Sequence, residues 1–165
     1  QPGSEAQTLQ RIDLLETFNW LIGLWVQHLG APVTLTAEFE REPDPELPGD
    51  TQTRLLCTRL RPASDGPYWF RLVEGYTLAT PGDDSSRQPT LVVWRKLSDD
   101  PERDNAVLQH FLLEKLQISP REQTYAVIYV NGSHTLPNPV VEGEQIRVRL
   151  IEEAFHQAMW SQAGA

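Results

Sequence analysis

The fold is decided by residues 90–130, where two apolar runs, Thr90-Leu91-Val92-Val93-Trp94 and Tyr125-Ala126-Val127-Ile128-Tyr129-Val130, stand on either side of an amphipathic segment. Short, nearly unbroken apolar runs are typical of strands that are covered on both faces of a parallel sheet. Between the two runs, apolar side chains recur at helical spacing: Ala106, Leu108, Phe111, Leu112 and Leu116. Strand, helix and strand in this order predict a right-handed parallel crossover and an α/β fold.

Further strands are expected before this crossover, because apolar side chains alternate with polar ones or gather between turn signals. They are expected at Val33–Phe39, Leu55–Leu60 and Tyr68–Leu78. The Pro- and Gly-rich stretches 42–50 and 81–89 are expected to be loops. The sequence therefore predicts a mixed sheet of about five or six strands with helices packed on it.

A long N-terminal helix is expected from Leu9 to Leu29, because apolar residues recur at steps of three and four until Gly30 and Pro32. A second apolar stripe on this helix indicates that it is central or lies against a partner. Aromatic side chains carry much of the energy of such interfaces. The candidate interface residues are therefore Phe18, Trp20 and Trp25.

The C-terminal segment allows two interpretations. Ile146, Val148 and Leu150 alternate with arginines as in a strand, and a C-terminal helix would then follow. The rival interpretation is a single helix over residues 144–160. The sequence alone leaves open whether Glu144–Leu150 is strand or helix.

Length and composition indicate one domain, expected at residues 9–160, with a flexible remnant of a longer protein at 1–8 and a tail at 161–165. The net charge of −9 is a poor match for a domain that binds phosphate over its whole surface. No apolar stretch approaches the length of roughly 18 residues that a membrane span needs. The single cysteine, Cys57, excludes an internal disulfide, so the reduced cytoplasm is the expected location.

No catalytic, cofactor-binding or metal-binding residue is predicted. The four histidines have no second His or Cys at metal-ligand spacing. The acids of residues 99–104 suit helix capping better than a divalent ion, because the calcium-loop pattern with its central Gly is missing. Asp65-Gly66-Pro67-Tyr68 departs at Gly66 from the Asp-Pro-Pro-Tyr motif of amino-methyltransferases, and the chain has no Gly-rich cofactor loop. The chain is therefore expected to bind or to hold something together.

Two groups of residues are candidate binding sites. The loop Asn131-Gly132-Ser133-His134 follows the carboxyl end of a buried strand, where open α/β sheets often bind ligands. Arg54, Arg59, Arg61 and Arg71 cluster in sequence and could contact DNA, with Trp69 beside them. Solvated edge charges that deter aggregation explain these arginines about as well.

Four segments of the chain resemble a known family in that family's own order. Asp13-Leu14-Leu15-Glu16-Thr17-Phe18-Asn19-Trp20-Leu21-Ile22-Gly23-Leu24 is similar to the segment that opens the C-terminal domain of Type III-like, adenine-specific DNA methyltransferases, the modification subunits of restriction-modification systems. Val92-Val93-Trp94-Arg95 and Tyr129-Val130-Asn131-Gly132 resemble the next two signatures. Glu153-Ala154-Phe155, running to Met159-Trp160, looks like the closing helix.

The resemblance implies a parent protein that transfers a methyl group from S-adenosylmethionine to adenine in DNA. It implies that the catalytic and cofactor motifs lie upstream, so that this chain itself holds no cofactor. The expected function is that of a non-catalytic accessory domain for assembly, dimerisation or partner-subunit binding. The implied partners are the parent's own methyltransferase domain, a second modification subunit, the restriction subunit, and DNA through the parent.

Two alternatives stay open beside this hypothesis, namely a DNA-backbone-contacting domain of the same protein and a small stand-alone enzyme working at the Asn131–His134 loop. The chain also departs from the family in two places. Ser133 stands where the family often has an acid, and residues 135–149 are longer than is usual for the family.

Overall fold

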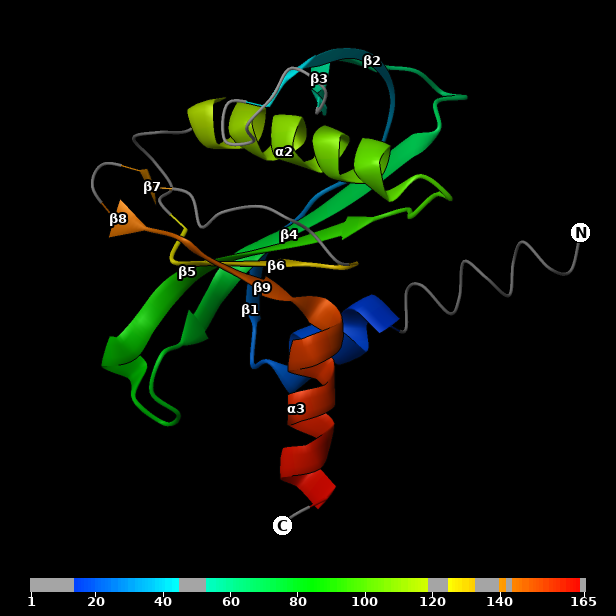
Figure 1. The fold of residues 1–165 in the computed structure, drawn as a ribbon. Helices are drawn as coiled ribbons and strands as arrows, with labels where there is room; N and C mark the ends of the chain where they lie inside the picture. Colours follow the sequence, from blue (N-terminus) through cyan, green and yellow to red (C-terminus); the bar gives the residue numbers. More distant parts are fainter. Residues whose placement is uncertain (1–13, 45–52, 119–124, 133–139, 142–143, 164–165) are drawn as a thin grey trace, which may run out of the picture.

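The computed structural model describes residues 14–44, 53–118, 125–132, 140–141 and 144–163. Its main sheet has seven strands in the order β3-β2-β4-β5-β6-β9, with β1 paired to β4 beside β2 (Figure 1). The strands of this sheet are β1 (Trp25–Leu29), β2 (Val33–Pro43), β3 (Thr53–Pro62), β4 (Tyr68–Leu78), β5 (Arg87–Arg95), β6 (Val127–Val130) and β9 (Arg147–Leu150). The other elements are α1 (residues 14–21), η1 (Asp84–Ser86), α2 (Pro101–Ile118), the short pair β7 (Val140–Val141) and β8 (Glu144–Gln145), and α3 (Ile151–Ala163).

The predicted crossover is confirmed, and with it the α/β class and the mixed sheet. β5 pairs with β6 in parallel, with Leu91 opposite Ile128, and α2 connects the two strands. β6 also pairs in parallel with β9, whereas β1 to β5 pair antiparallel. Leu91, Val92, Val93 and Ile128 are all 0% exposed. Both faces of the central strands are therefore covered, as unbroken apolar runs require.

Side chains that alternate along the strands supply two separate cores, one on each face of the sheet. Figure 1 shows α2 across one face and α1 with α3 on the other. The core beneath α2 includes Phe70, Leu91, Val93, Leu108 and Ile128. The core beneath α1 and α3 includes Phe18, Val73, Val92, Val127 and Ile151. This two-layer cover places α1 inside the domain and not beside it.

The prediction of one helix from Leu9 to Leu29 is wrong beyond residue 21, and residues 9–13 lie outside the described part of the chain. Gly23 adopts a left-handed φ of 67°, and its amide donates to the Trp20 carbonyl at 3.1 Å, which ends the helix. Trp25–Leu29 then forms β1 along the edge of β4. Gly75 of β4 permits this pairing, because a Cβ there would lie 2.1 Å from the carbonyl oxygen of Trp25.

At the C-terminus the strand interpretation is confirmed and the single-helix interpretation is wrong. Arg147–Leu150 is β9, and α3 begins directly after it at Ile151. α3 includes residues 161–163, which were predicted to be a tail. In Figure 1 its second half extends away from the sheet. Among the described helices, none is both long and apolar enough to cross a bilayer.

Candidate functional site

The ends of β5 and β6 are joined by an exchange of hydrogen bonds between Arg95 and Asn131. The Arg95 amide donates to Asn131 Oδ1 at 2.9 Å, and Asn131 Nδ2 donates back to the Arg95 carbonyl oxygen at 2.9 Å. Arg95 Nε also donates to the Asn131 carbonyl oxygen at 2.8 Å. These bonds continue the pairing of the two parallel strands by one residue beyond the ladder.

The guanidinium of Arg95 extends this junction to the start of α2. Its Nη1 donates to the Asp104 carbonyl oxygen at 3.2 Å and to Asn105 Oδ1 at 3.2 Å, and its Nη2 donates to the Gly132 carbonyl oxygen at 3.4 Å. Burial lowers the pKa of Arg95, while the carboxylates of Asp104 and Glu152 act in the opposite direction. The group of Arg95, Asn131 and their hydrogen-bond partners is called the β5–β6 junction below.

Two of the acids at the start of α2, Asp100 and Asp104, accept backbone amides, in agreement with the predicted capping role, whereas Glu102 pairs with Arg41. Asp100 Oδ1 accepts from the Arg103 amide at 3.1 Å, and Asp104 Oδ2 accepts from the Ser98 amide at 2.8 Å. Each carboxylate therefore satisfies an amide near the helix start. Within the described ranges, no three His, Cys, Asp or Glu side chains are placed to share a metal ion.

The structure describes two of the four residues of the predicted ligand loop, and both have structural roles. Asn131 belongs to the β5–β6 junction. Gly132 has a φ of 81°, and its amide donates to Glu152 Oε1 at 2.8 Å, which ties the loop to the first turn of α3. Ser133 and His134 lie outside the described residues.

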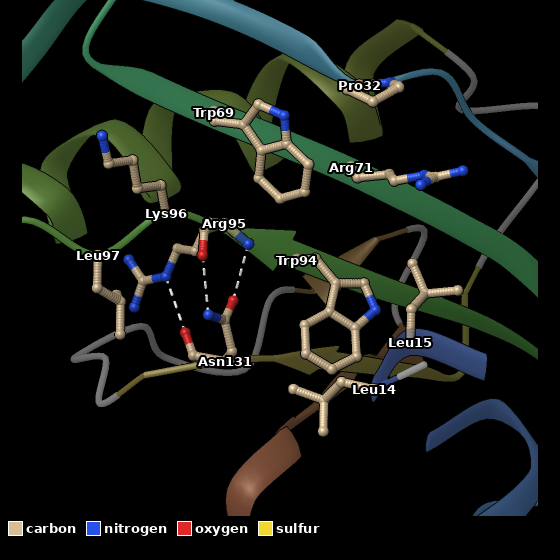
Figure 2. Close-up of a pocket in the computed structure, with 10 residues that line it drawn as sticks. All are labelled: Leu14, Leu15, Pro32, Trp69, Arg71, Trp94, Arg95, Lys96, Leu97 and Asn131. Atoms are coloured by element: carbon tan, nitrogen blue, oxygen red, sulfur yellow. Dashed lines mark hydrogen bonds between the residues drawn. The ribbon is translucent and has the colours of Figure 1, made fainter. Parts of the chain in front are cut away.

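A cavity of about 560 Å³ lies beside the junction, on the α1 side of the sheet (Figure 2). Its apolar walls are Leu14, Leu15, Pro32 and Leu97, with Asn131 at its edge, and the indoles of Trp69 and Trp94 also line it. Its cationic side chains are Arg71, Lys96 and the buried Arg95. A volume of this size is typical of small-ligand sites.

Each of the two outer cations of this cavity has a tryptophan as its neighbour on the other of the two paired segments, β4 or the end of β5. Arg71 stands opposite Trp94 in the strand register. Lys96 lies next to Trp69, because its amide donates to the Trp69 carbonyl oxygen at 3.1 Å. The sequence singled out Arg71 and Trp69 but missed Trp94 and Lys96 as their neighbours. The available signal was the repeat of Trp-x-cation on two adjacent antiparallel strands.

The four arginines predicted to contact DNA are not brought into one basic face. Arg54 and Arg61 lie on β3 and pair with Glu42 and Glu38 of β2. Arg59 is opposite Glu38 in the register. Arg71 lies apart from them in the cavity. Acids from β2 therefore accompany the arginines of β3, which disfavours a phosphate-binding surface there.

The three predicted interface residues divide between the core and the surface. Phe18 is 0% exposed and packs against Trp94, Tyr129 and Phe155, so it belongs to the core. Trp20 is 72% exposed and Trp25 is 59% exposed. Trp25 stacks on Tyr76 with ring centroids 5.6 Å apart. Only Trp20 and Trp25 are therefore available to a partner.

A buried acid–phenol pair lies on the α2 side of the sheet. The Tyr125 hydroxyl donates to Glu74 Oε1 at 2.5 Å, and both residues are buried. Burial raises the pKa of Tyr125, and the hydrogen bond to Glu74 and the charge of that carboxylate raise it further. In the folded protein the phenol therefore keeps its proton at a pH where an exposed tyrosine loses it.

This pair predicts a loss of stability in alkali. An unfolded tyrosine releases its proton near pH 10, whereas folded Tyr125 retains it, so the unfolded state binds fewer protons there and the free energy of unfolding falls as pH rises through about 10. Tyr125→Phe is expected to make this fall shallower in urea denaturation series between about pH 8 and 11. Tyr76→Phe, on the same strand as Glu74, is the control. An equal slope in Tyr125→Phe and the parent chain would contradict the expectation.

Comparison with known proteins adds no relative: no family model, no curated protein and no solved structure matches the chain.

Proposed function

We propose that this chain is a non-catalytic assembly domain, the C-terminal accessory domain of an adenine-specific DNA methyltransferase, and that it holds two copies of its parent together. The parent's methyl transfer from S-adenosylmethionine belongs to residues outside this chain. The proposed location is the cytoplasm, which agrees with a single cysteine, Cys57, that is buried and unpaired.

The arrangement of the four family-like segments supports this parentage. The first segment contains α1 and the Gly23 turn. The second and third meet in the β5–β6 junction through Arg95 and Asn131. The closing helix places Phe155 against Phe18 of the first segment, with ring centroids 6.2 Å apart. The family-like segments are far apart in the sequence, but they contact one another in the fold. This is expected if they belong to one structural unit that the family shares.

The observation that carries the assembly role is the edge strand β1. All five of its residues are exposed, and within the described part of the chain it pairs only with β4. The strands at the two ends of the sheet, β3 and β9, carry three and two arginines respectively. β1, with the sequence Trp-Val-Gln-His-Leu, carries no Lys, Arg, Asp or Glu and no Pro. It lacks the features that keep other edges from pairing with a second chain.

A second copy of this chain is the partner that best fits this edge. Two antiparallel strands pair with each other around a two-fold axis, so one edge can serve both subunits. Two chains with a net charge of −9 repel each other. A contact made through an uncharged strand, with Trp20, Trp25, Val26 and Leu29 exposed nearby, keeps that repulsion small.

The chain is therefore expected to be a dimer in sedimentation equilibrium. The double variant Val26→Glu/Leu29→Glu is expected to be a monomer, because four like charges would face one another across the two-fold axis. The control is Leu113→Glu on α2, since Leu113 is 49% exposed and Val26 and Leu29 are each 47% exposed. The control is expected to remain a dimer.

Two results would contradict the proposal. One is a chain that stays monomeric at the highest concentration that can be reached. The other is a dimer that Val26→Glu/Leu29→Glu leaves intact, since β1 would then not form the contact. A monomer that associates only with its parent's methyltransferase domain or with the restriction subunit would overturn self-pairing and assign the edge to that partner.

A further inference from the structure

We propose that the cavity lined by Trp69 and Trp94 binds a nucleotide or a short single strand, with a base stacked on an indole and with phosphate held by Arg71 on one side and by Lys96 on the other. This site goes beyond the assembly role, because it lies on a sheet face and not at the edge used by β1. It also differs from the predicted DNA contact through the arginines of β3.

The cations indicate an anionic ligand. Arg41, Arg54, Arg61 and Arg103 each have a carboxylate partner within 4 Å. Within the described residues, Arg71 and Lys96 have no ion pair at all, although the chain carries nine more acids than bases. Arg71 Nε donates to the Gly30 carbonyl oxygen at 3.3 Å, which orients the side chain and leaves its two terminal nitrogens to a ligand. A planar guanidinium fork of this kind suits phosphate.

The indoles indicate that the ligand is also planar. Trp69 and Trp94 come from adjacent strands and line the same side of the cavity. In Figure 2 both rings are seen broadside, with Arg71 to the right of Trp69 and Lys96 to its left. Bases stack on such side chains with about 1–3 kcal/mol each, whatever their identity. A ligand with a planar ring and an anionic group would match both the indoles and the cations of the cavity. A nucleotide has both groups.

The position and size of the cavity agree with this ligand. It lies where β5 ends, beside the carboxyl end of the parallel strand β6, which is a common place for ligands in open α/β sheets. Its volume of about 560 Å³ falls within the usual range for such sites. A duplex keeps its bases stacked inside, so the rings of a cavity reach a base only in a single strand or a free nucleotide. These are the two sources of the same chemistry.

The test is fluorescence anisotropy of the full chain with a labelled short oligothymidylate at low salt. Trp69→Ala is expected to weaken binding about tenfold or more, because it removes one stacking platform. Arg71→Gln/Lys96→Gln is expected to weaken binding and to reduce the salt slope of log affinity by about 1.4, at roughly 0.7 for each phosphate contact on a single strand. Arg59→Gln, which removes an exposed arginine of β3, is the control and is expected to leave both quantities unchanged.

Competition distinguishes the two sources. Displacement of the probe by thymidine monophosphate at a similar concentration assigns the site to free nucleotides, and displacement by unlabelled oligothymidylate alone assigns it to single strands. Equal binding of a hairpin duplex would overturn the proposal, as would no binding at low salt. An equal loss in Arg59→Gln and Arg71→Gln/Lys96→Gln would overturn it too. The monomeric Val26→Glu/Leu29→Glu chain is expected to bind as well as the parent chain, so the site and the dimer can fail separately.

Discussion

Replacing Arg95 by methionine is expected to lower the free energy of unfolding by about 3–5 kcal/mol. The guanidinium donates to the carbonyl oxygens of Asn131, Asp104 and Gly132, and Arg95 is only 5% exposed. Methionine has a similar length but no donor, so the buried oxygen of Asp104 and the partly buried oxygens of Asn131 and Gly132 would lose this donor. The carboxylates of Asp104 and Glu152 would also lose a nearby cation.

Urea denaturation of Arg95→Met beside Arg59→Met measures this effect. Arg59 is exposed on β3, so the same chemical change there is expected to alter stability by no more than about 0.5 kcal/mol. If the two variants lost the same stability, the β5–β6 junction would not have the structural role assigned to it.

Phe18→Ala is expected to cost about 3–5 kcal/mol of stability, the usual range for removing a fully buried aromatic ring. The Phe18 ring contacts Trp94, Tyr129 and Phe155, which come from two strands and the C-terminal helix. Its loss would leave a hole in the core beneath α1 and α3.

The matched variant is Trp20→Ala on the same helix. Trp20 is 72% exposed, so its truncation is expected to change the stability of the fold by about 0.5 kcal/mol or less. Thermal unfolding compares the two, each made in the monomeric Val26→Glu/Leu29→Glu chain so that loss of the dimer contact does not contribute. A near-neutral Phe18→Ala would mean that α1 is not packed into the domain, and the Phe18 side chain would then be free to serve the interface that the sequence predicts.

The crossover of β5, α2 and β6 could be predicted from the sequence because its signals are local. The two nearly unbroken apolar runs can each be recognised as a buried strand, and the amphipathic segment as a helix, from a few consecutive residues. The right-handed crossover then follows from the order of the three elements. β4 was predicted with the bounds that the structure has, Tyr68–Leu78.

β1 could not be predicted because Trp-Val-Gln-His-Leu does not alternate between apolar and polar residues as a half-buried strand does. Trp25 and Leu29 continue the helical spacing of the preceding segment, so the apolar pattern alone extends the helix. Two glycines determine that the helix ends and that a strand follows. Gly23 adopts a left-handed conformation, and Gly75 on β4, fifty residues further along the chain, leaves room for the backbone of Trp25. A strand that forms on a distant edge is set by tertiary pairing and not by local propensity.

The candidate site shows the same division between local and long-range information. Trp69-x-Arg71 was visible in the sequence, but its meeting with Trp94-x-Lys96 depends on the register of β4 against β5. Register likewise brings Glu42 and Glu38 of β2 to Arg54 and Arg61 of β3, so a cluster that reads as basic along the chain is accompanied by acids in space.

Hydrogen exchange of the β1 backbone tests the assembly role most directly. In the dimer, the amides of Val26–Leu29 that do not bond to β4 are expected to exchange slowly and to become fast on dilution or in Val26→Glu/Leu29→Glu, while those of β5 stay slow throughout. Outer β1 amides that exchange freely at every protein concentration would contradict the account.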